Sequence, residues 1–337
     1  MKVFRLTAAF LVSALASAAA IPSVGQAQEQ TLVLYTNDFE DIIGDRFTAD
    51  TGIEITVVQE SGGNLLARIA AERGNPQWDV LLFDGVGSLH SLDQDGQLLQ
   101  GFEPENLSNM ASWALDILPE SRGYFPAGAS SSCLLTYRTD LVDNPPQTFF
   151  DLTDESYRGL VGSADPAVAA PAYPCVAWLH YEYGVEEARE FYQGLIDNEL
   201  QVFRTNGPAR RALEAGDISI ALLSSPPAYA LLNSETPVEV IWPAEGAPSS
   251  SRGVAIQAST SQQEAAQTFI EWMLEPETQQ FLTDNAGIDG WFRASVEGVT
   301  PLAGGPAEDA VYNIAPAAFA SDNEAEIKNW FADQAVE

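Results

Sequence analysis

The stretch TGIEITVVQESGGNLLARIAAERGNPQWDVLLFDG, residues 51–85, decides the expected fold. Within it, IEITVVQ (53–59) alternates apolar and polar residues as a half-buried strand does. LLARIAAER (65–73) has the apolar spacing of an amphipathic helix, and WDVLLFDG (78–85) is typical of a buried strand. The same rhythm begins upstream, where TLVLYT (31–36) predicts a strand and a helix follows it up to Gly52. This βαβαβ order predicts a parallel sheet with right-handed crossovers.

A second block of strands and helices is expected between Ser130 and Trp242. A looser segment rich in Pro, Ser and Asn (101–128) precedes it, and SSSCLLTY (130–137) predicts its first strand. The helical stretch 262–287 follows both blocks. An early block, a later block and a return to the first predict two lobes with a ligand cleft between them.

The first 27 residues have the pattern of a secretory signal peptide. Lys2 and Arg5 form a basic start, an apolar run follows, and small residues precede a cleavage site after Ala27. A membrane anchor is the alternative, but the apolar run is short and lacks a basic stop-transfer flank. We expect a soluble periplasmic protein comprising residues 28–337.

Charge and cysteine content exclude several functions. The net charge of −33 repels nucleic acid and anionic lipid. Cys133 and Cys175 are the only cysteines, and in an oxidising compartment they form either one disulfide or two buried thiols. With His90 and His180 as the only histidines, a structural zinc site is not expected.

Three strands of the first block end in polar residues. Ligands of parallel sheets gather at the carboxyl ends of the strands. We therefore expect a ligand near these ends, whose residues are Asn37 and Asp38, Ser61, Gly62 and Gly63, and Asp84.

The quoted stretch resembles the opening of the periplasmic solute-binding proteins of ferric-ion and phosphonate-type ABC importers. FRTNGPARRALEAGDISIALL (203–223), VEVIWPAEGAPSSSRGVAI (238–256) and AAQTFIEWMLEPETQQFL (265–282) resemble later segments of the same family. The resemblance covers about residues 31–287, and its strength lies in the order and spacing of the motifs.

The resemblance implies an α/β, two-lobed periplasmic-binding-protein fold of type II, each lobe a mixed, mostly parallel sheet flanked by helices. We expect lobe 1 to comprise residues 28–128 and 252–300, lobe 2 to comprise 129–251, and a helical tail at 301–337 to pack on either lobe. It also implies a monomer without a cofactor, which closes on a small solute and delivers it to an ABC permease of the inner membrane.

Iron is the first alternative for the solute. In the iron-carrying members a His after the first strand, a Glu after the third and two adjacent tyrosines hold the metal. The matching residues here are Phe39, Asp84 and the pair Pro226 and Pro227. Ferric ion needs hard anionic oxygen donors, which phenylalanine and proline lack. We therefore expect no metal site, although a shifted loop could recruit Tyr229.

The positions that hold an anion in the family carry hydroxyls and helix starts here, which suit a phosphate or phosphonate. Ordinary helix capping is the alternative role of the serines. Two arginines could grip the anion through paired hydrogen bonds, or form surface ion pairs instead. Asp38 and Asp84 could receive an ammonium group. The expected ligand residues besides the strand ends above are Ser130, Ser131, Arg204, Asn206, Ser224, Ser225, Tyr229 and Arg252.

Two other classes of protein remain as alternatives. An exported enzyme is disfavoured because the chain has no GxSxG elbow, no P-loop and no GxGxxG motif. A sensory protein that presents its solute to a receptor would use the same binding chemistry. The preferred function is capture of a small organic anion or zwitterion, of the phosphonate or organophosphate type, for uptake.

Overall fold

The computed structural model describes residues 31–39, 42–243, 246–307 and 309–334. These residues form one compact unit. The predicted signal peptide lies outside the described residues. No helix within the described ranges is long and apolar enough to cross a membrane.

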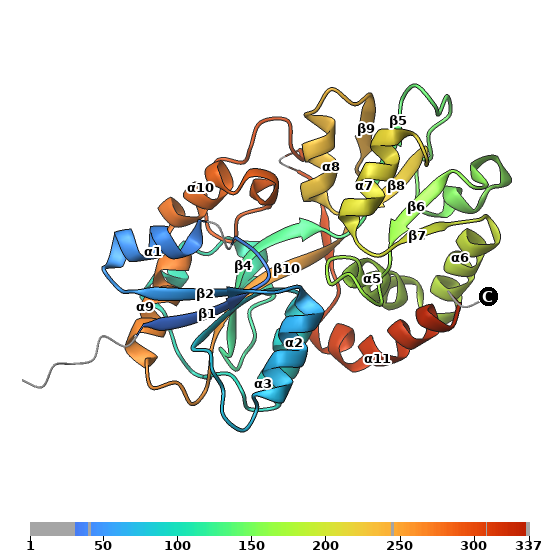
Figure 1. The fold of residues 1–337 in the computed structure, drawn as a ribbon. Helices are drawn as coiled ribbons and strands as arrows, with labels where there is room; N and C mark the ends of the chain where they lie inside the picture. The colour runs from blue at the N-terminus through green and yellow to red at the C-terminus, as the bar shows by residue number, and fades with distance from the viewer. Residues whose placement is uncertain (1–30, 40–41, 244–245, 308, 335–337) are drawn as a thin grey trace, which may run out of the picture. The chain divides into compact units, whose positions relative to one another are not determined.

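The first sheet contains the βαβαβ unit predicted from residues 31–85. Its core strand β1 (Leu32–Thr36) pairs in parallel with β2 (Ile55–Gln59) and with β3 (Val80–Asp84). The sheet continues from β3 to β10 (Ala247–Ile256), which runs antiparallel to β3, and from β10 to β11 (Tyr312–Ile314). Figure 1 shows how the early strands and β10 come together from distant parts of the chain.

The second sheet is built from the middle of the chain. Its strand order is β7 (Gln201–Phe203), β6 (Val161–Ala164), β8 (Ile220–Leu223), β5 (Leu134–Arg138) and β9 (Val238–Ile241). The strands β6, β7 and β8 run parallel, whereas β5 runs antiparallel to both β8 and β9. Both sheets are therefore mixed.

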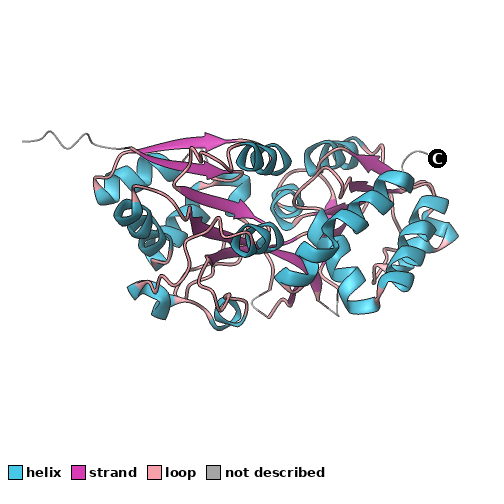
Figure 2. Cartoon of the chain, turned by 90° about the horizontal axis from the view of Figure 1, so that it is seen from below, coloured by secondary structure: helices cyan, strands magenta, loops and turns pink. Residues whose placement is uncertain are grey.

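Helices cover both faces of each sheet (Figures 1 and 2). Apolar side chains from the helices pack with those of the strands, because each helix buries one apolar stripe. In the first sheet these helices are α1 (Ile43–Thr51) and α9 (Gln263–Met273) on one face, with α2 (Gly62–Ala71) and α3 (Val86–Gln94) on the other. In the second they are α5 (Tyr173–Tyr183) and α6 (Val185–Asp197), with α7 (Asn206–Ala215) and α8 (Ser225–Leu232) opposite. The other α-helices of the described residues are α4 (Ser112–Asp116), α10 (Pro276–Asn285) and α11 (Ala317–Gln334).

A buried strand, β4 (Tyr124–Ser131), corrects two sequence-based expectations. It pairs antiparallel with β10 along almost its whole length, and all eight of its residues are buried. The looser segment expected at 101–128 thus ends before Tyr124, and the single strand expected at 130–137 is divided between two sheets. The chain leaves the first sheet at Ser131 and enters the second at Leu134.

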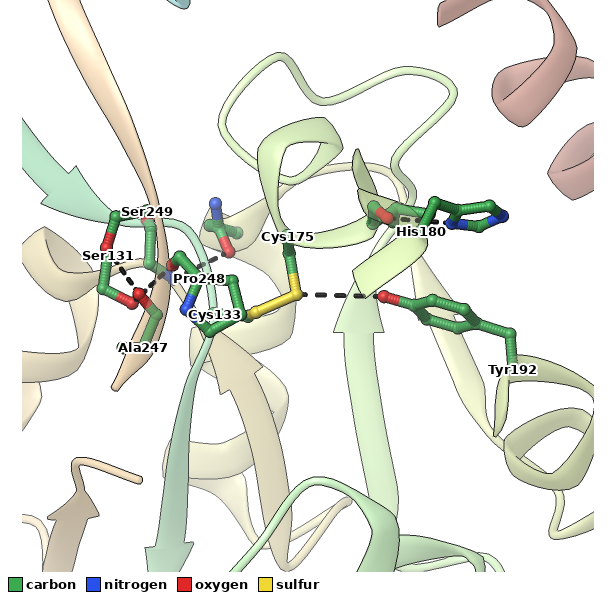
Figure 3. The surroundings of a disulfide bond; sticks show 11 residues. Ser131, Cys133, Cys175, His180, Tyr192, Ala247, Pro248 and Ser249 are labelled. Atoms are coloured by element: carbon green, nitrogen blue, oxygen red, sulfur yellow. Dashed lines mark hydrogen bonds between the residues drawn. A yellow bond between two sulfur atoms is a disulfide. The ribbon is translucent and has the colours of Figure 1, made fainter. Parts of the chain in front are cut away.

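A disulfide joins Cys133 to Cys175, with the two Cα atoms 5.8 Å apart. Figure 3 shows that it links the chain just before β5 to helix α5, next to the hydroxyl of Tyr192. The disulfide therefore fixes the exit of the crossing strand against the second sheet's helices. The sequence leaves open whether these cysteines form one disulfide or two buried thiols, and the structure has the disulfide.

The C-terminal helix α11 contacts helices of both sheets. Its Ser321 hydroxyl lies 3.1 Å from the hydroxyl of Ser91 in α3. The hydroxyl of Tyr173 in α5 donates to the carbonyl of Ala320 at 2.5 Å. The strand β11, also within the predicted tail, belongs to the first sheet. The lobe boundaries given above stay a prediction.

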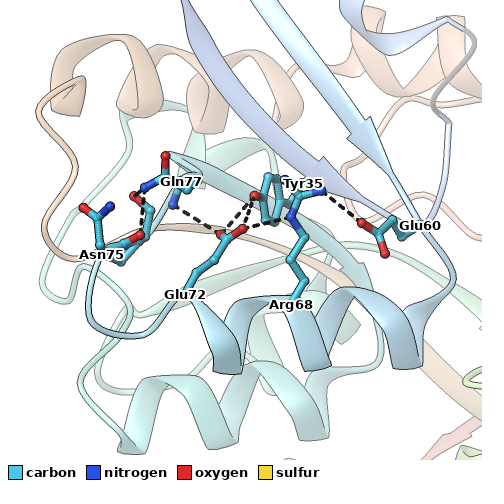
Figure 4. Close-up of polar contacts among 7 residues, drawn as sticks. Tyr35, Glu60, Arg68, Glu72, Asn75 and Gln77 are labelled. Carbon is cyan, nitrogen blue, oxygen red and sulfur yellow. Dashed lines mark hydrogen bonds and ion pairs between the residues drawn. The ribbon is translucent and has the colours of Figure 1, made fainter.

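A polar cluster fixes α2 against β1 (Figure 4). The Glu72 carboxylate accepts from the Tyr35 hydroxyl at 3.0 Å and from Arg68 Nε at 2.9 Å. Arg68 also pairs with Glu60 at 3.0 Å, and its guanidinium lies 4.8 Å from the centre of the Tyr35 ring. Burial and the Glu72 contact raise the pKa of Tyr35 to about 12. This cluster holds the C-terminal end of α2 against β1.

Candidate functional site

A cavity of about 350 Å³ lies where the ends of strands from both sheets meet the first turns of α7 and α8. A volume of this size lies at the lower end of the range for small-molecule sites. Its walls carry many hydroxyls, carboxylates and two guanidinium groups. The lining residues are Asn37, Asp38, Asp84, Ser130, Ser131, Ser132, Pro171, Asn206, Gly207, Arg210, Ser224, Pro226, Pro227, Ser250, Arg252, Ile288 and Asp289. We call this space the cleft cavity.

The cleft cavity brings together eight residues that the sequence predicts as ligand-binding. They come from the ends of β1, β3, β4 and β8, the start of α7 and the middle of β10, which are far apart in the chain. They are Asn37, Asp38, Asp84, Ser130, Ser131, Asn206, Ser224 and Arg252.

The other predicted residues lie elsewhere. Gly62 and Gly63 line a neighbouring cavity of about 80 Å³, whose wall shares Asp84 and Ser250 with the cleft cavity.

The ring of Tyr229, another predicted residue, stacks on that of Trp291, with centroids 5.8 Å apart. Ser61 is exposed at the start of α2, and Arg204 is exposed on the loop before α7. Ser225 is buried, and its hydroxyl accepts a hydrogen bond from the Ser131 amide at 3.1 Å.

Arg252 is the most constrained charged group of the cleft cavity. Only 4% of the residue is exposed, and it forms an ion pair with Asp38. Its guanidinium carbon lies 4.2 Å from the ring centre of Phe39 and 5.3 Å from that of Phe292. Its Nε and Nη1 atoms are buried and have no hydrogen-bond partner among the described residues. Buried donors without an acceptor are costly, so these nitrogens favour an incoming anionic group.

Phe39 holds an unusual backbone conformation beside this arginine. Its φ angle is 59°, in the left-handed region that bulky residues rarely adopt. Its amide donates to the Asp38 carboxylate at 3.1 Å, and its ring is buried against Phe292 with centroids 5.6 Å apart. Backbone strain of this kind persists where the surroundings fix it, often at functional sites. Here it turns the ring onto the guanidinium of Arg252.

The carboxylates of the cleft cavity have different environments. Burial raises the pKa of Asp38; Asp289 and Asp84 add to the rise, whereas the Arg252 guanidinium opposes it. Asp84 accepts from the Ser250 hydroxyl at 2.7 Å, and its amide donates to the side-chain oxygen of Asn37 at 3.0 Å. Three carboxylates thus line a space in which Arg252 already has an acidic partner.

The starts of α7 and α8 each offer few backbone donors. Thr205 precedes α7 without a side-chain cap, so the amides of Asn206 and Gly207 lack the usual capping acceptor, but Pro208 in the same turn has no N–H. Helix α8 begins at Ser225 with Pro226 and Pro227 in its first turn, and proline has no N–H. The prolines restrict the backbone angles of this wall, and they remove two possible donors to an anion.

Four lining residues with polar or charged side chains are absent from the sequence-based prediction. Ser132 is buried, and its hydroxyl has no partner in the described part of the chain. Ser250 continues a run of serines and belongs to the middle of β10. Arg210 pairs with Glu214 at 3.0 Å, and Asp289 follows α10. Ser132 follows the predicted serines 130–131 directly, so the sequence could have indicated it as a lining residue. No motif in the neighbouring sequence indicates Asp289 as a lining residue.

No group of three or more metal-binding side chains that could hold an ion occurs within the described residues. His180 is buried in α5, where Nδ1 lies 2.9 Å from the Val176 carbonyl (Figure 3), and burial lowers its pKa. His90 belongs to α3. Neither histidine lines the cleft cavity.

Comparison with known proteins gives the family. Residues 43–288 match the model of the bacterial extracellular solute-binding proteins. The chain belongs to this family. Its members are periplasmic proteins that bind small solutes for ABC transporters, and they are not enzymes.

Two relatives illustrate the range of this family. The probable ABC transporter periplasmic-binding protein y4fP of Sinorhizobium fredii is 28% identical over 292 residues, covering 80% of this chain and 75% of the relative. A putative 2-aminoethylphosphonate-binding periplasmic protein of Salmonella typhi is 24% identical over 241 residues, or 68% of each chain.

Solved structures confirm the predicted type II fold. Iron-bound HitA from Pseudomonas aeruginosa superposes with a TM-score of 0.79 at 22% identity, covering 89% of this chain and 99% of HitA. AfuA from Actinobacillus pleuropneumoniae, with fructose-6-phosphate bound, superposes with a TM-score of 0.80 at 18% identity, covering 90% of this chain and 98% of AfuA. At these identities the likeness concerns the fold.

Proposed function

We propose that this solute-binding protein captures a small organic anion or zwitterion in the cleft cavity and delivers it to an ABC permease. The observation that carries the proposal is Arg252, which is almost fully buried and has two guanidinium nitrogens without an acceptor. A phosphonate or phosphate oxygen would supply that acceptor. The hydroxyl of Ser132 and the first amides of α7 line the same space and could bind the remaining oxygens.

The carboxylates favour a zwitterion over a simple anion. Asp84 and Asp289 line the cavity together with the Asp38–Arg252 pair. A dianion alone would meet this negative charge, whereas an ammonium group on the same solute would offset it. Among the relatives, the Salmonella typhi protein is named for 2-aminoethylphosphonate, a solute with both groups.

The structure disfavours ferric ion as the solute. Pro226 and Pro227 line the cavity at the position of the paired tyrosines of iron carriers, and they offer no side-chain oxygen. Phe39, at the position of the iron-binding histidine, is buried against Arg252.

Calorimetric titration tests this proposal with matched solutes. We expect 2-aminoethylphosphonate to bind more tightly than ethylphosphonate, which lacks the amine, and both to bind more tightly than ethanolamine, which lacks the phosphonate. Fructose 6-phosphate, glucose and ferric citrate complete the panel. Tight binding of glucose or iron alone would refute the proposal.

A further inference from the structure

A second cavity, of about 370 Å³, lies next to the cleft cavity across the segment 290–293. Phe292 of this segment packs against Arg252 at the cleft cavity, whereas the neighbouring side chain of Arg293 contacts rings at the second cavity. Arg293 also pairs with Ala129 of β4 through backbone hydrogen bonds at 2.7 and 2.9 Å. The two spaces therefore share a wall. We call the second one the rear cavity.

Arg293 is half-buried in the rear cavity and is held by aromatic rings. Its guanidinium carbon lies 5.3 Å from the ring centre of Trp113 and 5.2 Å from that of Tyr312. Within the described ranges, no carboxylate forms an ion pair with it. Arg204 and Arg211 also form no ion pair with a carboxylate in the described part of the chain, but both of these arginines are exposed. In a chain with 48 acidic residues, a half-buried guanidinium without a carboxylate points to an anionic ligand from outside.

The walls of the rear cavity are held by contacts of their own. The indole nitrogen of Trp113 donates to the Ala294 carbonyl at 3.2 Å. Trp291 stacks on Tyr229, and the Tyr312 ring packs against that of Trp242 with centroids 4.9 Å apart. A ligand would therefore find its aromatic surfaces already in place, which reduces the entropy lost on binding.

We propose that the rear cavity is a second binding site, for a small monoanion that carries an aromatic ring, such as an aryl carboxylate. The carboxylate would accept two hydrogen bonds from the guanidinium of Arg293. The ring would pack between Trp113, Trp291 and the apolar side chain of Leu302, which also lines the space. Glu297 lies exposed at the same cavity and disfavours a second negative charge on the ligand.

Nuclear magnetic resonance of the tryptophan indole N–H groups tests this site, with benzoate as the probe. We expect benzoate to shift the signals of Trp113 and Trp291 in a saturable manner. Benzyl alcohol and benzylamine, which keep the ring but lack the negative charge, should shift them at least tenfold more weakly, because a charge-assisted pair is lost. Equal affinity for the three probes, or no shift with benzoate, would overturn the proposal.

Variants separate this site from the cleft cavity. Arg293→Gln should weaken benzoate binding about tenfold or more, while Arg211→Gln removes the same charge from an exposed position and should leave it unchanged. Ala307→Phe keeps Arg293 and fills the cavity from an exposed loop residue that lines it, so it should also prevent binding. Unchanged benzoate titrations in both Arg293→Gln and Ala307→Phe, or displacement of benzoate by 2-aminoethylphosphonate, would contradict a separate rear site.

Discussion

Replacing Arg252 by glutamine is expected to lower the affinity for the cleft solute about a hundredfold or more. Removing one partner of a buried, hydrogen-bonded charge pair costs roughly 2–5 kcal/mol in binding. The variant loses the donors Nε and Nη1, and it also leaves the Asp38 carboxylate buried without its cation. Calorimetric titration with 2-aminoethylphosphonate measures the loss.

Arg204→Gln is the matched control for this experiment. Both arginines are predicted from the sequence, but Arg204 is exposed on the loop before α7 and does not line the cleft cavity. Its replacement should change the affinity less than threefold, since exposed charges contribute little. Circular dichroism of each variant without solute separates loss of binding from loss of folding. If Arg252→Gln folds and binds as the wild type does, Arg252 does not hold the solute.

Removing the disulfide is expected to lower the free energy of unfolding by about 4 kcal/mol. The bond closes a loop between positions 42 residues apart, and the chain-entropy model gives this value for a loop of that length. Both cysteines are buried, so the double variant Cys133→Ser, Cys175→Ser also places two hydroxyls in an apolar cluster. Equilibrium unfolding in guanidinium chloride measures the change.

Wild-type protein treated with a reductant provides the control, because it lacks the bond but keeps the sulfur atoms. We expect its unfolding midpoint to fall between those of the oxidised protein and the double serine variant. Identical midpoints for the oxidised and reduced protein would show that the bond does not contribute to stability.

The fold could be predicted where the signals are local. The strands and helices of residues 31–85 follow from alternation, amphipathic spacing and Gly52, which ends α1 with a φ of 74°. The sequence does not predict strand β4, because Pro126, Gly128 and the small residues around them do not favour a strand by themselves. Its pairing partner β10 lies more than a hundred residues later in the chain, so the burial of β4 depends on tertiary structure.

The candidate site can be predicted from the sequence only to the level of strand ends and helix starts. Their positions follow from the topology, which is why Asp38 and Asp84 lie together at the cleft cavity. Arg252 lies in the middle of β10 and comes beside Asp84 through the pairing of β10 with β3. The direction in which a side chain points cannot be predicted from the topology. Arg204 and Arg210 flank the same helix start, yet Arg204 is exposed and Arg210 lines the cavity. The packing of Phe39 and Phe292 on Arg252 likewise depends on residues from opposite ends of the chain.

Native mass spectrometry of protein purified without unfolding shows directly which solute the cleft cavity holds. We expect one small organic anion or zwitterion bound to each wild-type chain, and none on Arg252→Gln. Retention of iron or of a neutral sugar, or an equal load on the wild type and Arg252→Gln, would contradict this expectation.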